Sequence, residues 1–135
     1  MDPTVQTILG VLFRWVHIMS AIVLVGSAYY VRRARLAFAP GFQSTIYLAV
    51  AGVFISGLYN FLTKPSYPPH YHMWFGIKFL LALHVMAALV LAVRRQVPTE
   101  KLERSLRITL ISATAVVLIS NYLRWISLSP LVKLP

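Results

Sequence analysis

The apolar run from Met73 to Arg95, MWFGIKFLLALHVMAALVLAVRR, constrains the fold more than any other stretch of this sequence. A membrane-spanning helix needs about 20 mostly apolar residues, and this run supplies them before it ends on two arginines. Lys78 and His84 interrupt the run. Because an ionisable side chain in a membrane helix costs free energy unless a partner offsets it, these two residues indicate a functional site.

Three further apolar runs accompany the first. Hydrophobic residues make up 59% of the 135 residues and charged residues only 12%, about half the charged share of a soluble domain. The sequence therefore predicts an all-α integral membrane four-helix bundle with up-down-up-down topology, formed as a single domain over residues 1–135. The expected spans cover about residues 8–31, 44–62, 73–93 and 108–128.

Composition also narrows the classes of function. The formal net charge is +10, but the basic residues lie between apolar runs, which predicts lipid headgroups rather than nucleic acid as their partner. The absence of cysteine excludes disulfides, thiolate catalysis and iron–sulfur clusters. The three acidic residues, Asp2, Glu100 and Glu103, all lie near expected helix starts, so none is expected as a buried proton relay. Asp2 followed by Pro3 predicts the start of the first helix.

The distribution of cations predicts the orientation in the membrane. One face collects Arg32, Arg33, Arg35, Arg94, Arg95, Lys101, Arg104 and Arg107, while Lys64 and Lys133 lie at the loops of the other. Positively charged loops favour the cytoplasmic side. We therefore expect a multi-pass protein of a bacterial inner membrane with both termini on the outer side. Tryptophans then fall near the outer interface, at positions 15, 74 and 125.

Two histidines lie at matching depth in this arrangement. At a rise of about 1.5 Å per residue, His17 is roughly 13 Å inside the first span and His84 roughly 15 Å inside the third. Both spans run in the same direction. Two imidazoles at one level on two helices suit the axial ligands of haem b, so the sequence predicts a haem held by His17 and His84.

Three cations fit the same cofactor. Arg14 precedes His17 by three residues, and Lys78 precedes His84 by six, so both lie closer to the outer surface than the histidines. Arg124 lies at the outer end of the fourth span. The propionates of a haem pointing outward would lie near Arg14, Lys78 and Arg124.

Packing offers a simpler interpretation of the same residues. A single histidine in a membrane helix can be a polar packing residue, and Arg14 and Lys78 can extend to the headgroups. Small residues in the second span, Gly52, Ser56 and Gly57, are expected to allow close helix packing and nothing more.

The outer loop holds a second candidate site. His70, His72 and Met73 together present two imidazoles and a thioether, a donor set that suits copper, especially Cu(I). Histidines in a proline-rich loop are more often solvated or hydrogen bonded, so copper remains the lesser alternative.

Residues 13–30, FRWVHIMSAIVLVGSAYY, resemble the first helix of a loose group of membrane proteins. The group comprises the HemJ-type protoporphyrinogen oxidases, the copper-resistance protein D family and the membrane domain of the cytochrome-linked urate oxidases. In that group an early histidine is followed by small residues and an aromatic pair, which His17, Gly26-Ser27 and Tyr29-Tyr30 match. Val25 stands where a tryptophan is usual.

The third span resembles the same group. Trp74 to Lys78 is similar to the tryptophan-and-lysine opening of the third helix in the HemJ type, although the fourth helix lacks that type's asparagine–glutamate–proline pattern. The resemblance implies a small haem b scaffold in which His17 and Lys78 are tied to haem and activity. Lys78 then becomes an alternative second ligand in place of His84.

The sequence thus predicts a haem b-binding membrane protein that transfers single electrons near the outer face. Its partner would be a quinol or a periplasmic electron carrier. One alternative is a non-catalytic accessory subunit of a larger respiratory or photosynthetic complex, whose histidines bind chlorophyll or nothing. The other alternative is an enzyme that resembles the protoporphyrinogen oxidases.

Overall fold

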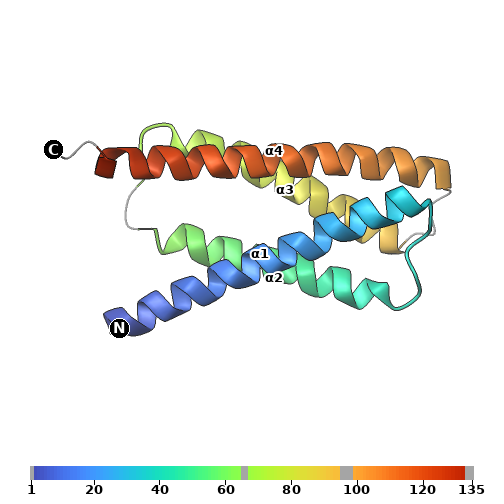
Figure 1. Ribbon diagram of the computed structural model, residues 1–135, viewed down its shortest axis with the longest axis horizontal. Helices are drawn as coiled ribbons and strands as arrows, with labels where there is room; N and C mark the ends of the chain where they lie inside the picture. Colours follow the sequence, from blue (N-terminus) through green and yellow to red (C-terminus); the bar gives the residue numbers. More distant parts are fainter. Residues whose placement is uncertain (1, 65–66, 95–98, 133–135) are drawn as a thin grey trace.

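The structure is a computed structural model that describes residues 2–64, 67–94 and 99–132. These residues form four α-helices, each containing a segment long and apolar enough to span a membrane. The helices are α1 (Pro3–Ala34), α2 (Phe42–Leu62), α3 (Tyr71–Arg94) and α4 (Thr99–Val132). Successive helices run in opposite directions (Figure 1), which confirms the all-α four-helix architecture and the multi-pass membrane class. Arg95 and Lys133, used to predict orientation, lie outside the described residues.

The first helix begins where the sequence predicts. The Asp2 carboxylate accepts a hydrogen bond of 2.8 Å from the Thr4 backbone N–H, and Pro3 occupies the first helical position. The helix ends at Ala34, and the cap residue Arg35 has a left-handed backbone (φ 52°) and donates its N–H to the Arg32 carbonyl. Helix α4 extends beyond its predicted span because the amphipathic residues that precede the span continue the same helix.

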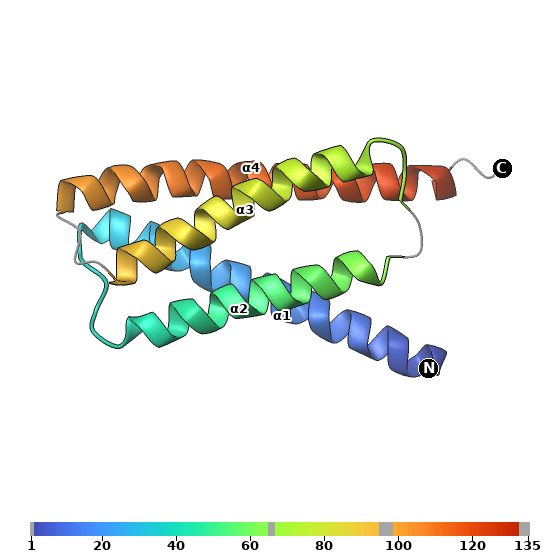
Figure 2. The same ribbon diagram turned by 180° about the vertical axis from the view of Figure 1, so that it is seen from behind.

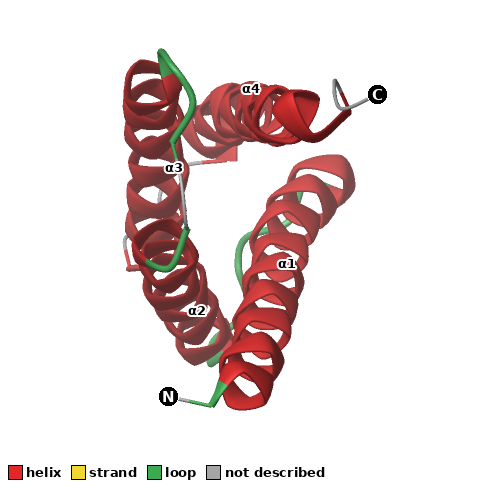
Figure 3. Ribbon diagram, turned by 90° about the vertical axis from the view of Figure 1, so that its left-hand side faces the viewer, coloured by secondary structure: helices red, strands yellow, loops and turns green. Residues whose placement is uncertain are grey.

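The helices associate as two pairs. Helix α1 packs chiefly on α2, and α3 packs chiefly on α4. The view along the bundle (Figure 3) shows the two pairs meeting where α2 adjoins α3 and where α1 approaches α4. The first half of α1 and the second half of α4 diverge from each other (Figures 1 and 2).

The two ends of the bundle differ in character. The end that holds the start of α1, the α2–α3 loop and the last part of α4 carries Trp15, Trp74 and Trp125, and we call it the aromatic end. The opposite end, where α1 and α3 finish and α4 begins, we call the basic end. Its described arginines are Arg32, Arg33, Arg35, Arg94, Arg104 and Arg107.

The aliphatic core lies in the half of the bundle nearer the basic end. Its most buried members come from all four helices: Leu24, Ala28, Val31, Ile46, Ala49, Val85, Met86, Leu89, Val93, Leu102, Leu106 and Ala113. Gln43 of α2 adds a hydrogen bond of 2.8 Å to the Val93 carbonyl of α3. The half nearer the aromatic end instead holds buried or half-buried polar side chains, among them His17, Ser56 and Lys78. Packing therefore holds the basic half together and leaves polar groups in the aromatic half.

Close packing of α1 on α2 predicts the effect of one substitution. A Cβ atom at Gly52 would collide with the Ser20 Oγ and lie 3.2 Å from the Ser20 Cβ, whereas a Cβ at Gly26 meets nothing within 4 Å. We expect Gly52→Val to lower the free energy of unfolding by about 1–3 kcal/mol, the usual effect of overpacking. Gly26→Val is the matched control. Equal loss of stability in both variants, measured by detergent unfolding, would contradict this packing.

Candidate functional site

His17 is turned toward α2 rather than toward lipid. Its side chain is half-buried, and Nδ1 lies 3.1 Å from the Val53 carbonyl oxygen and 3.0 Å from the Ser56 Oγ. A carbonyl oxygen only accepts, so Nδ1 carries the hydrogen. Ser56 donates its own hydrogen to the Gly52 carbonyl and can accept from His17. The second ring nitrogen, Nε2, is left as a bare lone pair with no hydrogen bond to the described residues.

A glycine lets the imidazole approach α2 this closely. A Cβ atom at Gly57 would lie 3.2 Å from the His17 Cε1 and 3.5 Å from Nδ1. The prediction that small residues of the second span allow close helix packing is confirmed by Gly52 and Gly57. Ser56, which is 1% exposed, adds a role that the sequence did not suggest, because its hydroxyl helps to orient His17.

An unpaired hydroxyl lies one turn from this histidine, on the side of the aromatic end. Tyr59 of α2 stacks on Phe13 of α1 with ring centroids 4.0 Å apart. The Tyr59 hydroxyl is buried and has no hydrogen-bond partner among the described residues. Because buried polar atoms are nearly always hydrogen bonded, this hydroxyl indicates a missing partner in the same half of the bundle.

Three cations interact electrostatically with one another, and one of them, Lys78, acts on His17. Lys78 of α3 is half-buried and lies close enough for its charge to act on the His17 imidazole. The charge of Lys64, in the α2–α3 loop, acts on Lys78, and the charge of Arg14 on α1 acts on Lys64. No carboxylate of the described part of the chain forms an ion pair with these groups. We call Arg14, Lys64 and Lys78 the cation cluster.

Lys64 is the member of the cluster that sequence reasoning assigned only to a surface loop. Its ammonium donates a hydrogen bond of 2.7 Å to the Ser127 hydroxyl of α4 and lies 4.4 Å from the centroid of the Tyr71 ring. Lys64 therefore connects the loop to α3 and α4 at the aromatic end of the bundle. A lysine beside a proline-rich loop gives no signal in the sequence that would reveal these contacts.

The structure does not bring His84 to His17. His84 is exposed on α3, while Val85 and Leu89 are buried. Lys78, Val85 and Leu89 are separated by seven and four residues and so share one face of the helix, and His84 lies about a third of a turn away from that face. The depth predicted for His84 stays a prediction, but the exposure of its side chain shows that it does not face the bundle. Of the two proposed partners for His17, Lys78 is the one on the inward face.

The remaining candidates lie at the surface. Arg124 is exposed on α4 and joins no described member of the cation cluster. The three copper candidates are also exposed, and His72 packs its ring against Tyr67 with centroids 4.9 Å apart. His70 adopts a left-handed backbone (φ 63°), and its carbonyl accepts a hydrogen bond from the Trp74 N–H in the first turn of α3. The described residues contain no group of three histidine or acidic side chains placed to hold a metal ion.

Comparison with family models, with curated proteins and with solved structures finds no match to this chain. The similarity to the HemJ-type group therefore rests on the quoted residues alone. It stays a prediction.

The cation cluster predicts a pH dependence. Burial lowers the pKa of Lys64 below its ordinary value of 10.5, and the charge of Arg14 lowers it further. The unfolded chain then holds this proton more tightly than the folded protein does. Protonated Lys64 opposes folding, and the penalty disappears as pH rises from the lowered pKa through 10.5.

We expect Arg14→Gln to raise the Lys64 pKa toward 10.5, because one of the two causes of the shift is removed. The measurement is an NMR titration of ¹³Cε-labelled lysine. Arg94→Gln removes an equal charge at the basic end and serves as the control. A Lys64 pKa that responds equally to both variants, or to neither, would show that Arg14 is not its electrostatic neighbour.

Proposed function

We propose that this chain binds one haem b in the aromatic half of the bundle, with His17 as an axial ligand, and transfers single electrons there. The observation that supports the proposal most is the fixed orientation of His17. Its Nδ1–H is directed to the Val53 carbonyl and Ser56, so Nε2 offers a lone pair. Histidines that bind metals are typically held in this way by a hydrogen bond from the other ring nitrogen.

The surroundings of His17 fit the charge of a haem. The cation cluster has no carboxylate partner among the described residues, and the two propionates of haem b are anions of the kind that would neutralise it. The unpaired Tyr59 hydroxyl is another donor in the same half of the bundle. Haem supplies one-electron chemistry when bound. The positive charge of Arg14, Lys64 and Lys78 would stabilise its reduced form and raise its potential.

We propose Lys78 as the second residue that contacts the haem. It would serve either as the second axial ligand of the iron or as the partner of a propionate. Lys78 lies on the inward face of α3, and its charge reaches His17, whereas His84 is exposed. An amine can bind iron only as the neutral base, while a propionate partner must stay charged. The two roles therefore differ in the protonation of one nitrogen atom.

The electron partner is proposed from the position of the site. The positive-inside rule places the basic end in the cytoplasm of a bacterium and the aromatic end, with both termini, on the outer side. A haem near the aromatic end would exchange electrons with a quinol in the membrane or with a periplasmic carrier. Membership of a larger membrane complex is compatible with the same site.

A second function is favoured by one specific observation. The charge of Lys78 acts on His17, and these are the two residues that the resemblance to HemJ-type proteins ties to haem and activity. Oxidation of protoporphyrinogen is therefore the alternative proposal. Rescue of a bacterial strain that lacks this step, by the wild-type chain but not by Lys78→Ala, would favour it over simple electron transfer.

The first test is a reduced-minus-oxidised visible spectrum of the purified chain and three variants. We expect a b-type spectrum in the wild type and its loss in His17→Ala, because that variant removes the proposed ligand. Lys78→Ala should lose the band if the amine binds iron, or keep it at lower potential if the amine faces a propionate. His84→Ala is the matched control and should keep the wild-type spectrum.

Two outcomes would overturn this assignment. A spectrum lost in His84→Ala but kept in His17→Ala would exchange the roles of the two histidines. A wild-type chain that never contains haem, whether expressed alone or isolated from its native membrane, would favour the non-catalytic accessory subunit.

A further inference from the structure

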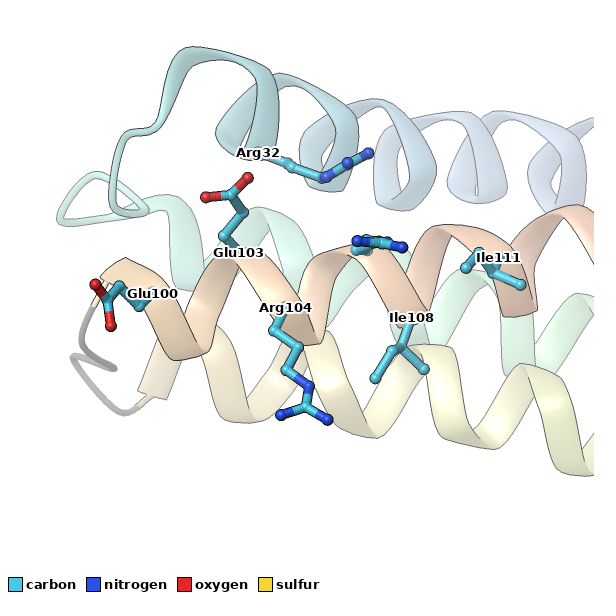
Figure 4. Close-up of a pocket in the computed structure, with 7 residues that line it drawn as sticks. Arg32, Glu100, Glu103, Arg104, Ile108 and Ile111 are labelled. Atoms are coloured by element: carbon cyan, nitrogen blue, oxygen red, sulfur yellow. The ribbon is translucent and has the colours of Figure 1, made fainter.

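A pocket lies at the basic end, far along the bundle from His17. It occupies about 600 Å³ between the end of α1 and the beginning of α4. Its lining residues are Arg32, Glu100, Glu103, Arg104, Arg107, Ile108 and Ile111. A second hollow of about 290 Å³ adjoins it, because both share Arg32 and Glu103. Figure 4 shows Glu103 of α4 extending toward α1, and the Arg32 guanidinium of α1 directed away from the Glu103 carboxylate.

Arg32 lacks a hydrogen-bond acceptor that its position requires. The Nε atom is buried and has no partner among the described residues, and no ion pair joins Arg32 to Glu103. A guanidinium presents several donors in a fixed plane, a geometry that matches phosphate and carboxylate oxygens. The Nε itself is covered by protein, so the terminal nitrogens of Arg32, which lines the pocket, are the donors that an anion there would contact.

The charge of the pocket favours an anion over a cation. The two hollows together are lined by five arginines and two glutamates. The added arginines, Arg33 and Arg35, lie in the last turn of α1 and its cap. Because the arginines outnumber the glutamates, guanidinium donors would remain for an anion even if Glu100 and Glu103 each paired with an arginine.

One wall of the pocket is apolar and continues into the membrane-spanning part of α4. Ile108 and Ile111 are 47% and 63% exposed and follow Arg107 along the helix. At a rise of about 1.5 Å per residue, Ile111 lies roughly 6 Å deeper than Arg107. A ligand that fills this pocket would place an anion among the arginines and an apolar chain along the isoleucines.

We propose that the pocket binds the phosphate of an anionic phospholipid, with an acyl chain lying along Ile108 and Ile111. Basic pockets between membrane helices at the cytoplasmic side are typical sites for anionic lipid headgroups. A free phosphate would satisfy Arg32 but would leave the isoleucines uncovered. The proposal does not depend on haem, because none of the pocket residues belongs to the histidine site or the cation cluster.

The test is a titration of the detergent-solubilised full chain with short-chain phosphatidylglycerol, with bound lipid counted by native mass spectrometry. Arg32→Gln and Arg107→Gln should each weaken binding by roughly fivefold, the contribution of one basic residue near a membrane surface. Phosphatidylcholine, whose headgroup is neutral overall, should bind more weakly than phosphatidylglycerol. Arg107 is exposed, so its variant reports on binding even if Arg32→Gln fails to fold.

Arg94→Gln is the matched control, because Arg94 is an exposed arginine at the same end and does not line the pocket. It should bind phosphatidylglycerol as the wild type does. The proposal fails if Arg94→Gln weakens binding as much as Arg107→Gln, since the charge effect would then be general. It also fails if inorganic phosphate at the same concentration prevents lipid binding, because the pocket would then prefer the free anion.

Discussion

The hydrogen bond from His17 to α2 is the interaction on which the proposed site depends. An imidazole in a membrane helix costs free energy unless it is paired, and here the Val53 carbonyl and Ser56 take its Nδ1–H. The bond is possible because Gly52 and Gly57 let α1 and α2 approach each other. One requirement of local packing therefore decides which ring nitrogen is free.

The two halves of the bundle differ in composition. Aliphatic side chains from all four helices fill the half nearer the basic end and make up most of the buried hydrophobic residues in the described part of the chain. The other half keeps polar and cationic groups in a membrane segment, where packing alone would favour aliphatic residues. The rigid half can hold the helices in place while the polar half accommodates a ligand. Helix packing alone does not explain the cation cluster or the buried, unpaired Tyr59 hydroxyl.

The helices and the depths of their residues could be predicted from this sequence, but the directions in which side chains point could not. Apolar runs, the Asp2-Pro3 cap and the arginine pairs predicted four helices in the observed order, with close bounds for α2 and α3, whereas α4 begins at Thr99, well before its predicted span. Depth follows from counting residues along a helix, so the sequence predicts a depth for both His17 and His84. Whether a side chain faces the bundle depends on which helix lies beside it, and this turned His84 outward.

The contacts of Lys64 escaped prediction for a related physical reason. Its partners, Ser127 and Tyr71, come from two other segments, so no local pattern contains them. The pocket at the basic end likewise joins the end of α1 to the start of α4. From the sequence, those arginines indicated the orientation of the chain and lipid headgroups as their partner, but not a pocket.

The most direct test of the central claim is the protonation of the His17 ring in the haem-free protein, read from its ¹⁵N chemical shifts by NMR. The hydrogen bond to Val53 predicts a protonated Nδ1 and a bare Nε2. Ser56→Ala should leave this tautomer in place, because the Val53 carbonyl still requires the Nδ1 hydrogen. A protonated Nε2 with a bare Nδ1 would contradict the account, since His17 would then offer no lone pair to a ligand inside the bundle.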